Sequence, residues 1–247
     1  MPPASRGRWI TLSAEMSRFP RASPAGFRCW ATQEPWGYLA LESRRQPHAW
    51  TQNTLQQALH DPLTGLPNRR RLREQLERMI EGAQRNQTSV MAVYMDLDRF
   101  KQINDTLGHS FGDRFLQYVV RRRLLPIIGQ NDLLARVGGD EFVLIMSEHD
   151  HPDIVHGAAK MAEALLKSLT APILLEGQEL AISVSIGISR YPTDAQDADS
   201  LVKNADVAMY RAKAEGRGDF RFFTSHMNRT TLERFELEAD LRYALTR

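Results

Sequence analysis

Regular hydrophobic patterns run from about residue 52 to residue 223 of this chain, and they are of two kinds. Leu72, Leu76, Met79 and Ile80 recur at helical spacing, which is typical of one buried helix face. Val90–Met95 is a short continuous apolar run, as in a buried strand. We likewise expect helices just after residue 98 and over residues 113–125, 153–169 and 199–215, and strands over residues 133–137, 142–146, 173–175, 180–188 and 220–223.

The order of these elements predicts the fold class. Helices and strands alternate, and the strands over residues 133–137 and 142–146 are joined only by Gly138–Glu141, which predicts a hairpin. Residues 173–175 and 180–188 predict another strand pair. We therefore expect an α/β fold with a mixed sheet covered by helices, in which Gly216 ends the last helix.

The two ends of the chain are less regular. Residues 1–50 hold all four tryptophans and half of the prolines without a sustained period. We interpret them as a leader or linker, with the remnant of an upstream sensor domain or a misassigned start as alternatives. A helix over residues 51–60 is expected to lead into a domain that ends near residue 225. Residues 226–247 predict an amphipathic linker helix that reaches Arg247 without a capping signal, which we interpret as leading toward a further domain.

Composition restricts the cellular compartment and the kinds of partner that we expect for this domain. The 247 residues carry a net charge of +2, so charge alone gives no argument for a nucleic-acid or membrane surface. Cys29 is the only cysteine, which excludes an intrachain disulfide and suits a reducing compartment. No apolar run approaches the ~20 residues of a membrane span, and no signal peptide is recognisable. We expect a cytoplasmic protein without a direct membrane span or a nucleic-acid partner.

Two acids stand where the apolar run of residues 90–95 ends. Asp96 and Asp98 flank Leu97, and a carboxylate at the end of a buried strand is held rigidly at the edge of the sheet. Mg²⁺ takes oxygen ligands, usually one or two carboxylates together with substrate phosphates, so this position suits a magnesium ligand. The plainer alternative is that Asp98 caps the helix that follows.

The connection Gly138–Glu141 places two more acids at a hairpin tip. Gly138 and Gly139 permit positive φ and close approach of a ligand to the backbone. A solvated acidic turn is the alternative, although two adjacent acids exceed what a turn needs. If the hairpin lies beside residues 90–95, Asp96 and Asp140 can share one metal ion or a pair about 3.5–4 Å apart, which would activate a hydroxyl and stabilise a phosphoryl transition state.

Two cations near the end of the last predicted helix are further candidates. Lys213 and Arg217 are four residues apart and can hold triphosphate oxygens. Basic residues at a helix C-terminus also complement the helix dipole, so this pattern alone is weak. We find no GxxxxGK[ST] or GxGxxG phosphate loop, no HExxH motif and no evident Ser-His-Asp set.

Together these motifs resemble the GGDEF domain of bacterial diguanylate cyclases over about residues 55–223. The matching segments stand in the order and spacing of that family: Asp61–Arg69, Asp96–His109, Gly112–Asp113, Arg136–Phe142, Ser183–Ile188, Asn204–Lys213 and Gly216–Arg217. The resemblance implies a palm-like, nucleotidyl-cyclase-like α/β fold with a mixed, largely antiparallel sheet. It also implies an enzyme that makes cyclic di-GMP from two GTP.

The resemblance implies roles for the acids. Asp96 and Asp140 are similar to the ligands of Mg²⁺ (or Mn²⁺), with the carbonyl of Leu97 as one ligand more. Glu141 resembles the acid that helps activate the 3′-hydroxyl or binds the second metal.

Substrate-binding residues follow from the same resemblance. Asn104 and Asp113 are similar to the residues that read guanine, because an amide and a carboxylate suit its polar edge. The residues implied to meet the phosphates are Phe100, Lys101, Lys213 and Arg217. Gly138 and Gly139 are implied to leave room for the nucleotide. The resemblance implies no catalytic role for three further residues, which are similar to residues that fix the start of a helix: Asp61, Asn68 and Arg69.

The implied reaction needs two GTP-loaded domains, because the 3′-hydroxyl of each GTP attacks the α-phosphate of the other. We therefore expect a homodimer, with the helix near residues 50–59 as a dimerising stalk. The alternative is a catalytically silent GGDEF module that binds GTP and regulates a neighbouring phosphodiesterase domain. The segment Leu237–Leu245 resembles a link to such an EAL-type domain. A purely structural dimerisation module would leave the set of acids and Asn104 unexplained.

One position departs from the family pattern. Many members have an RxxD site for product inhibition just before the signature strand. Asp132 matches its acid, but Gly129 occupies the position of the arginine, and the run Arg121–Arg123 is out of register. We expect weak or absent inhibition by cyclic di-GMP at this site.

Overall fold

The computed structural model describes residues 58–227. The expected leader, most of the helix expected over residues 51–60 and the helix expected from residue 228 onward lie outside the described residues. The described residues belong to one compact unit. No helix among them has both the length and the apolar character needed to cross a membrane.

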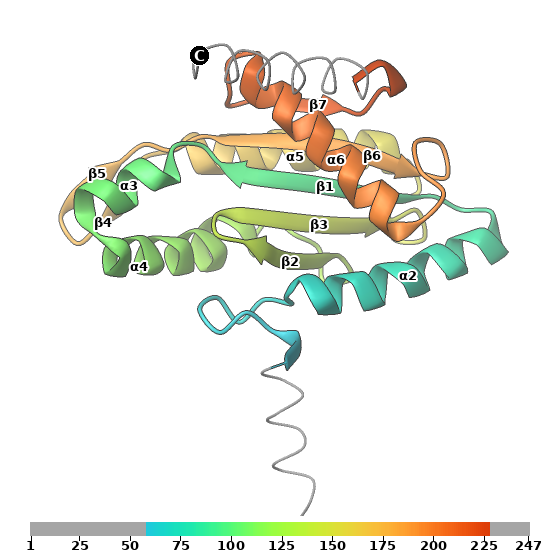
Figure 1. Cartoon of the computed structure of the whole chain (residues 1–247), viewed down its shortest axis with the longest axis horizontal. Helices are drawn as coiled ribbons and strands as arrows, with labels where there is room; N and C mark the ends of the chain where they lie inside the picture. The colour runs from blue at the N-terminus through green and yellow to red at the C-terminus, as the bar shows by residue number, and fades with distance from the viewer. Residues whose placement is uncertain (1–57, 228–247) are drawn as a thin grey trace, which may run out of the picture. The chain divides into compact units, whose positions relative to one another are not determined.

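A five-stranded sheet lies at the centre of residues 58–227 (Figure 1). Its strands follow the spatial order β2 (Leu133–Gly138), β3 (Glu141–Ser147), β1 (Val90–Leu97), β6 (Val184–Tyr191) and β7 (Phe220–Phe222). Neighbouring strands are antiparallel except β6 and β7, which are parallel. A separate hairpin joins β4 (Ile173–Leu175) to β5 (Gln178–Leu180). The predicted α/β fold with a mixed, largely antiparallel sheet is confirmed.

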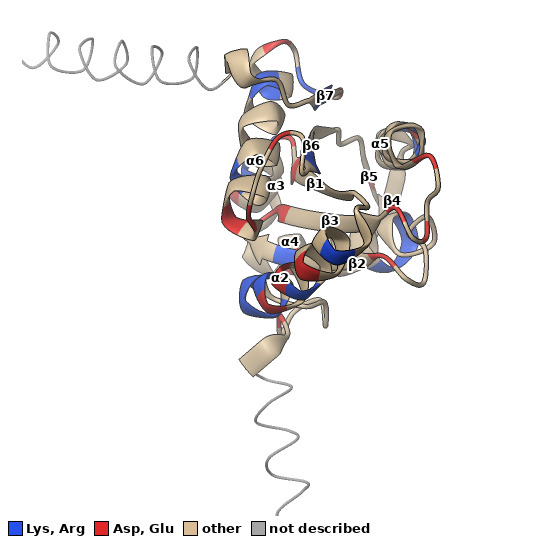
Figure 2. Ribbon diagram, turned by 90° about the vertical axis from the view of Figure 1, so that its right-hand side faces the viewer, with Lys and Arg blue, Asp and Glu red and all other residues tan. Residues whose placement is uncertain are grey.

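Helices cover both faces of the sheet (Figures 1 and 2). On one face lie α2 (Arg69–Asn86) and α6 (Ala198–Ala214). On the other lie α4 (His109–Val119), its π-helical continuation Val120–Leu124, and α5 (Ile154–Thr170). The short α3 (Phe100–Leu107) follows β1 directly and packs against α4. In Figure 2 the charged residues lie mainly on helices and turns, whereas the strands are mostly tan.

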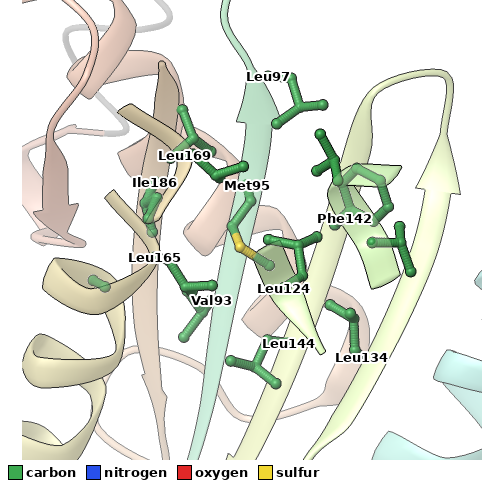
Figure 3. Packing of buried hydrophobic residues seen from close by; sticks show 14 of the residues in the cluster. Val93, Met95, Leu97, Leu124, Leu134, Phe142, Leu144, Leu165, Leu169 and Ile186 are labelled. Atoms are coloured by element: carbon green, nitrogen blue, oxygen red, sulfur yellow. The ribbon is translucent and has the colours of Figure 1, made fainter. Parts of the chain in front are cut away.

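The central strand β1 is buried over its whole length, which explains its continuous apolar sequence. Met95 and Leu97 belong to the core on the side of α4 and α5, together with Phe142 (Figure 3). Tyr94, one residue out of phase, packs toward α2 and α6. Because strand side chains alternate, Asp96 emerges on the same face as Tyr94, beneath α6.

Three predicted elements differ in extent. β1 continues through Leu97, because Asp96 pairs with a strand on each side. α4 begins at His109, since Gly108 with φ +86° already separates it from α3. The expectation of one strand over residues 180–188 is wrong: β4 pairs with β5, and β6 starts at Val184 in the main sheet. Gly216, with φ +134°, follows α6 as predicted.

Candidate active site

The strand register brings acids of two strands together at one end of the sheet. Asp96 in β1 is paired with Glu141 in β3 and, on its other side, with Ser185 in β6. The backbone N–H of Leu97 donates to the carbonyl of Asp140 at 3.3 Å. The condition for a shared site, that the hairpin lies beside β1, is therefore met.

A lysine neutralises part of the charge at this strand end. Nζ of Lys213, at the end of α6, lies 2.6 Å from Oδ2 of Asp96. Burial raises the pKa of Asp96, and Lys213 opposes that rise. Burial likewise raises the pKa of Asp140, against the effects of its own backbone N–H and of Lys213. Since partly buried carboxylates are costly without a partner, a second cation beside Lys213 would stabilise this pair.

A cavity of about 210 Å³ opens at the same place. It is lined by predicted metal ligands and predicted phosphate-binding residues together: Asp96, Leu97, Asp140, Phe100, Lys101, Lys213 and Arg217. These residues come from the end of β1, the β2–β3 hairpin, the start of α3, the end of α6 and the turn that follows α6. Positions that are far apart in sequence thus surround one small volume.

The oxygen donors at this cavity fit Mg²⁺. Asp96 and Asp140 offer two carboxylates, and Mg²⁺ usually takes one or two together with waters and substrate phosphates. Within residues 58–227 no three His, Cys, Asp or Glu side chains are grouped as an all-protein metal site. This donor set leaves most coordination positions of such an ion to waters or to an added ligand. The contact with Lys213 shows that the Asp96 carboxylate accepts a cation.

The predicted guanine readers lie on two packed helices. Asn104 in α3 is half-buried, and Asp113 in α4 is exposed. A Cβ atom built on Gly112 would lie only 1.9 Å from Oδ1 of Asn104. Because Gly112 has no side chain, the Asn104 amide can lie against α4 at the position just before Asp113.

The two glycines at the hairpin tip matter because they lack side chains, and not because they adopt an unusual backbone conformation. The positive φ that glycines permit is not used here, because neither Gly138 nor Gly139 is in the left-handed region. A Cβ atom on Gly138 would lie 2.6 Å from Oε2 of Glu141, whereas Gly139 faces open space. Gly138 thus leaves room for the Glu141 carboxylate, and Gly139 leaves room for a ligand.

Comparison with known proteins agrees with this geometry. The family model described as diguanylate cyclase, GGDEF domain, matches residues 58–219. This chain belongs to the GGDEF family. The bifunctional diguanylate cyclase/cyclic di-GMP phosphodiesterase MucR of Pseudomonas aeruginosa is 45% identical over 193 residues, which are 78% of this chain and 27% of MucR. Diguanylate cyclase TpbB of the same species is 36% identical over 186 residues, 74% of this chain and 41% of TpbB. The chain thus spans about a quarter of MucR and two fifths of TpbB.

Solved GGDEF structures share the fold. The GGDEF domain of TpbB superposes with a TM-score of 0.64 at 36% identity, covering 70% of this chain and 99% of that domain. The coiled coil and GGDEF domain of DgcB from Caulobacter crescentus, solved with c-di-GMP, gives a TM-score of 0.59 at 26% identity, covering 70% of this chain and 89% of that one.

Arg136, the first residue of the signature segment, supports the tip of the GGDEF hairpin. Its Nε and Nη2 donate to the carbonyl of Gly139 at 2.9 and 2.6 Å, and its Nη1 donates to Oδ1 of Asp61 at 3.0 Å. Burial would raise the pKa of Asp61, but hydrogen bonds from Thr64 and Arg136 outweigh it and the pKa lies below the usual range. Sequence reasoning gave Arg136 no role, although its place beside the two glycines was a usable signal.

Replacing Arg136 by alanine is expected to lower the free energy of unfolding by roughly 2–3 kcal/mol at pH 7, because it removes the cation paired with a half-buried Asp61 carboxylate and leaves that carboxylate only its hydrogen bonds from Thr64. The pKa of Asp61 is lowered by folding, so its contribution is present above about pH 4 and is lost as the pH falls. Urea unfolding should therefore show a large difference at pH 7 and a small one near pH 3.

Arg70→Ala is the matched control for this measurement. Arg70 forms an exposed pair with Glu74, with the two side chains 71% and 38% exposed, so its loss should change stability by only a few tenths of a kcal/mol. Equal losses from the two variants would contradict the role assigned to Arg136.

Asp98 is the residue that sequence reasoning misread. The alternative that it caps the following helix is wrong, since Arg99 is the N-cap of α3 and no side chain caps it. Asp98 is instead buried, with 4% of its surface exposed, and hydrogen-bonded to β6.

Asp132 does not present a free carboxylate. Its Oδ1 lies 2.8 Å from Nε2 of His151, and its Oδ2 accepts the backbone N–H of Gly129 at 3.2 Å. The side chain is only 1% exposed. Asp132 therefore closes a local turn, and at Gly129 no side chain is present to join it.

Proposed function

We propose that this GGDEF domain is an active diguanylate cyclase, which condenses two GTP into cyclic di-GMP and releases two pyrophosphates. The observation that carries the proposal is the pairing of Asp96 with Glu141, which brings Asp140 beside Asp96 at a cavity that Lys213 of α6 also lines. The family supports it, and the signature residues 136–142 are unaltered.

In the proposed site, Asp96 and Asp140 would hold Mg²⁺ (or Mn²⁺), with the carbonyl of Leu97 as one ligand more. The ion would supply charge that stabilises the phosphates and acidifies the attacking hydroxyl. Lys213 contacts Asp96, and its ammonium group would be available for phosphate oxygens if Asp96 held the ion instead. Glu141, paired with Asp96, would help to activate the 3′-hydroxyl or bind a second metal ion.

Nucleotide binding would use the start and middle of α3 and the first half of α4. Phe100 and Lys101 line the cavity at the start of α3, where they and Arg217 would meet the triphosphate. Asn104, one turn further along, would bind guanine together with Asp113. This order along one helix matches the order of base and phosphates within a nucleotide.

One such site holds one GTP, so the full reaction would need two domains face to face. Dimer formation costs association entropy. The rate per chain should therefore rise with protein concentration when the purified chain is assayed with GTP and Mg²⁺. A rate per chain that stays constant down to dilute monomer would contradict the dimeric mechanism.

The second candidate is a silent module that binds GTP and regulates an adjoining phosphodiesterase domain. Relatives named cyclic di-GMP phosphodiesterases favour it: NbdA of Pseudomonas aeruginosa is 35% identical and PdeR of Escherichia coli 38% identical, and the chain covers 24% and 27% of them. GTP binding without any product, even from an artificially dimerised chain, would favour this reading.

Product inhibition through Asp132 is expected to be weak or absent. The carboxylate is engaged by His151 and Gly129, and no arginine stands at position 129. Cyclic di-GMP at concentrations well above those of the enzyme should leave the rate nearly unchanged, and Asp132→Ala should not alter product binding. Tight product binding that disappears in Asp132→Ala would show the opposite.

A further inference from the structure

The carboxylate of Asp98 joins three separate segments of the chain beside the cavity. The hydroxyl of Ser185 donates to its Oδ1 at 2.7 Å, and the hydroxyl of Ser183 donates to its Oδ2 at 2.6 Å. The backbone N–H of Gly218 also donates to Oδ2, at 3.2 Å. Asp98 thus ties the end of β1 to the start of β6 and to the turn after α6.

That turn has an unusual backbone. Gly216, Arg217 and Gly218 have φ values of +134°, +66° and +63°. Left-handed backbone is sparsely populated for a residue with a side chain, so Arg217 needs external support to stay there. The N–H of Arg217 donates to the carbonyl of Ala212 at 3.0 Å, and the next N–H is the one bound by Asp98.

Arg217 is also close to Asp98 through its side chain. Its Nε lies 3.9 Å from Oδ1 of Asp98, while about half of the side chain stays exposed. Both residues line the 210 Å³ cavity. The same carboxylate therefore binds the backbone N–H of Gly218 and lies close to the guanidinium group of Arg217, the turn residue that is expected to meet phosphates.

We propose that Asp98 is a positioning residue: oriented by Ser183 and Ser185, it holds the left-handed turn so that Arg217 is presented to the triphosphate of the bound nucleotide. This inference rests on the proposed nucleotide site, but not on turnover. Asp98 acts only through Arg217 and needs no contact with the nucleotide. The competing explanation is that the buried carboxylate merely stabilises the fold.

The test compares Asp98→Asn and Ser185→Ala with a matched control, Ser189→Ala. Ser189 is a buried serine of the same strand whose hydroxyl donates to the carbonyl of Leu201 at 2.6 Å, and it does not line the cavity. Asp98→Asn is expected to raise KM for GTP about tenfold, since it weakens charge-assisted hydrogen bonds. Ser185→Ala should cause a smaller rise, and Ser189→Ala should leave KM within about twofold despite a similar loss of stability.

A double-mutant cycle separates positioning from general stability. In an Arg217→Ala background, Asp98→Asn and Ser185→Ala should raise KM no further, because the residue through which they act is gone. Full additivity with Arg217→Ala, or an unchanged KM in Asp98→Asn, would overturn the proposal. If Asp98→Asn does not fold, Ser185→Ala and its cycle with Arg217→Ala decide the question.

Equilibrium binding of a non-reactive GTP analogue with Mg²⁺ gives the same comparison without catalysis. If the wild-type chain binds the analogue but makes no product even as an artificially dimerised fusion, the cyclase proposal fails, and the analogue affinities of the variants still decide the positioning role. Equal analogue affinity in wild type, Asp98→Asn and Ser185→Ala would overturn the positioning role even if the wild type makes cyclic di-GMP.

Discussion

Asp140→Ala is expected to lower the rate of cyclic di-GMP formation by roughly three orders of magnitude or more, because a catalytic metal contributes several kcal/mol to phosphoryl chemistry. Asp140 is the hairpin acid whose backbone is hydrogen-bonded to β1 beside Asp96. Its loss would leave Asp96 as the only carboxylate of the proposed metal site, already in contact with Lys213. Product formation followed by chromatography measures the effect.

The matched control is Asp150→Ala. Asp150 follows the opposite end of β3 and accepts hydrogen bonds from Ser147 and Asn131 at 2.7 and 2.8 Å. Its replacement should reduce stability slightly and leave turnover within about twofold, since these are surface contacts. Circular dichroism should show the same fold for both variants. More than a tenth of the wild-type rate in Asp140→Ala would refute the assigned role.

Gly112→Ala is expected to weaken GTP binding by roughly tenfold or more without unfolding the domain. The added Cβ would lie 1.9 Å from Oδ1 of Asn104 and 3.2 Å from Cζ of Phe100, so the Asn104 amide must rotate away from its position. A lost specific hydrogen bond to a base edge costs about 1–3 kcal/mol. The KM for GTP and the Kd for a GTP analogue should rise together, as in Asn104→Ala.

Gly82→Ala is the control for this prediction. Gly82 lies inside α2, and a Cβ atom there would meet only Nη2 of Arg85, at an ordinary 3.9 Å. Both substitutions replace a helical glycine by the better helix former, worth about 1 kcal/mol. Gly82→Ala should therefore be stabilising and fully active. Normal GTP affinity in Gly112→Ala would show that Asn104 does not read the base.

Sequence reasoning identified the acids of the site because they interrupt apolar runs at strand ends. Asp96 and Asp140 could be picked out in this way. They come together once the hairpin pairs with β1, as it does in the structure. The spacing of Leu72, Leu76 and Ile80 likewise predicted the buried face of α2. The local sequence pattern is sufficient to predict features that a single helix or strand determines.

Contacts between residues far apart in the sequence could not be predicted from local pattern. Asp98 looked like a helix cap because its partners, Ser183, Ser185 and Gly218, lie 85, 87 and 120 residues away. Similarly, no Gly or Pro marks the break between β5 and β6. The two strands are separate because β5 pairs with β4 whereas β6 pairs with β1. The contact between Lys213 and Asp96 also depends on how α6 crosses the sheet.

The most direct test is to incubate the purified chain with GTP and Mg²⁺ at several protein concentrations, alone and as an artificially dimerised fusion, and to measure cyclic di-GMP by chromatography. We predict two pyrophosphates per cyclic di-GMP and a rate per chain that increases with concentration or with forced dimerisation. Absence of product from the forced dimer, while a GTP analogue still binds, would contradict the cyclase and favour a regulatory GTP-binding module.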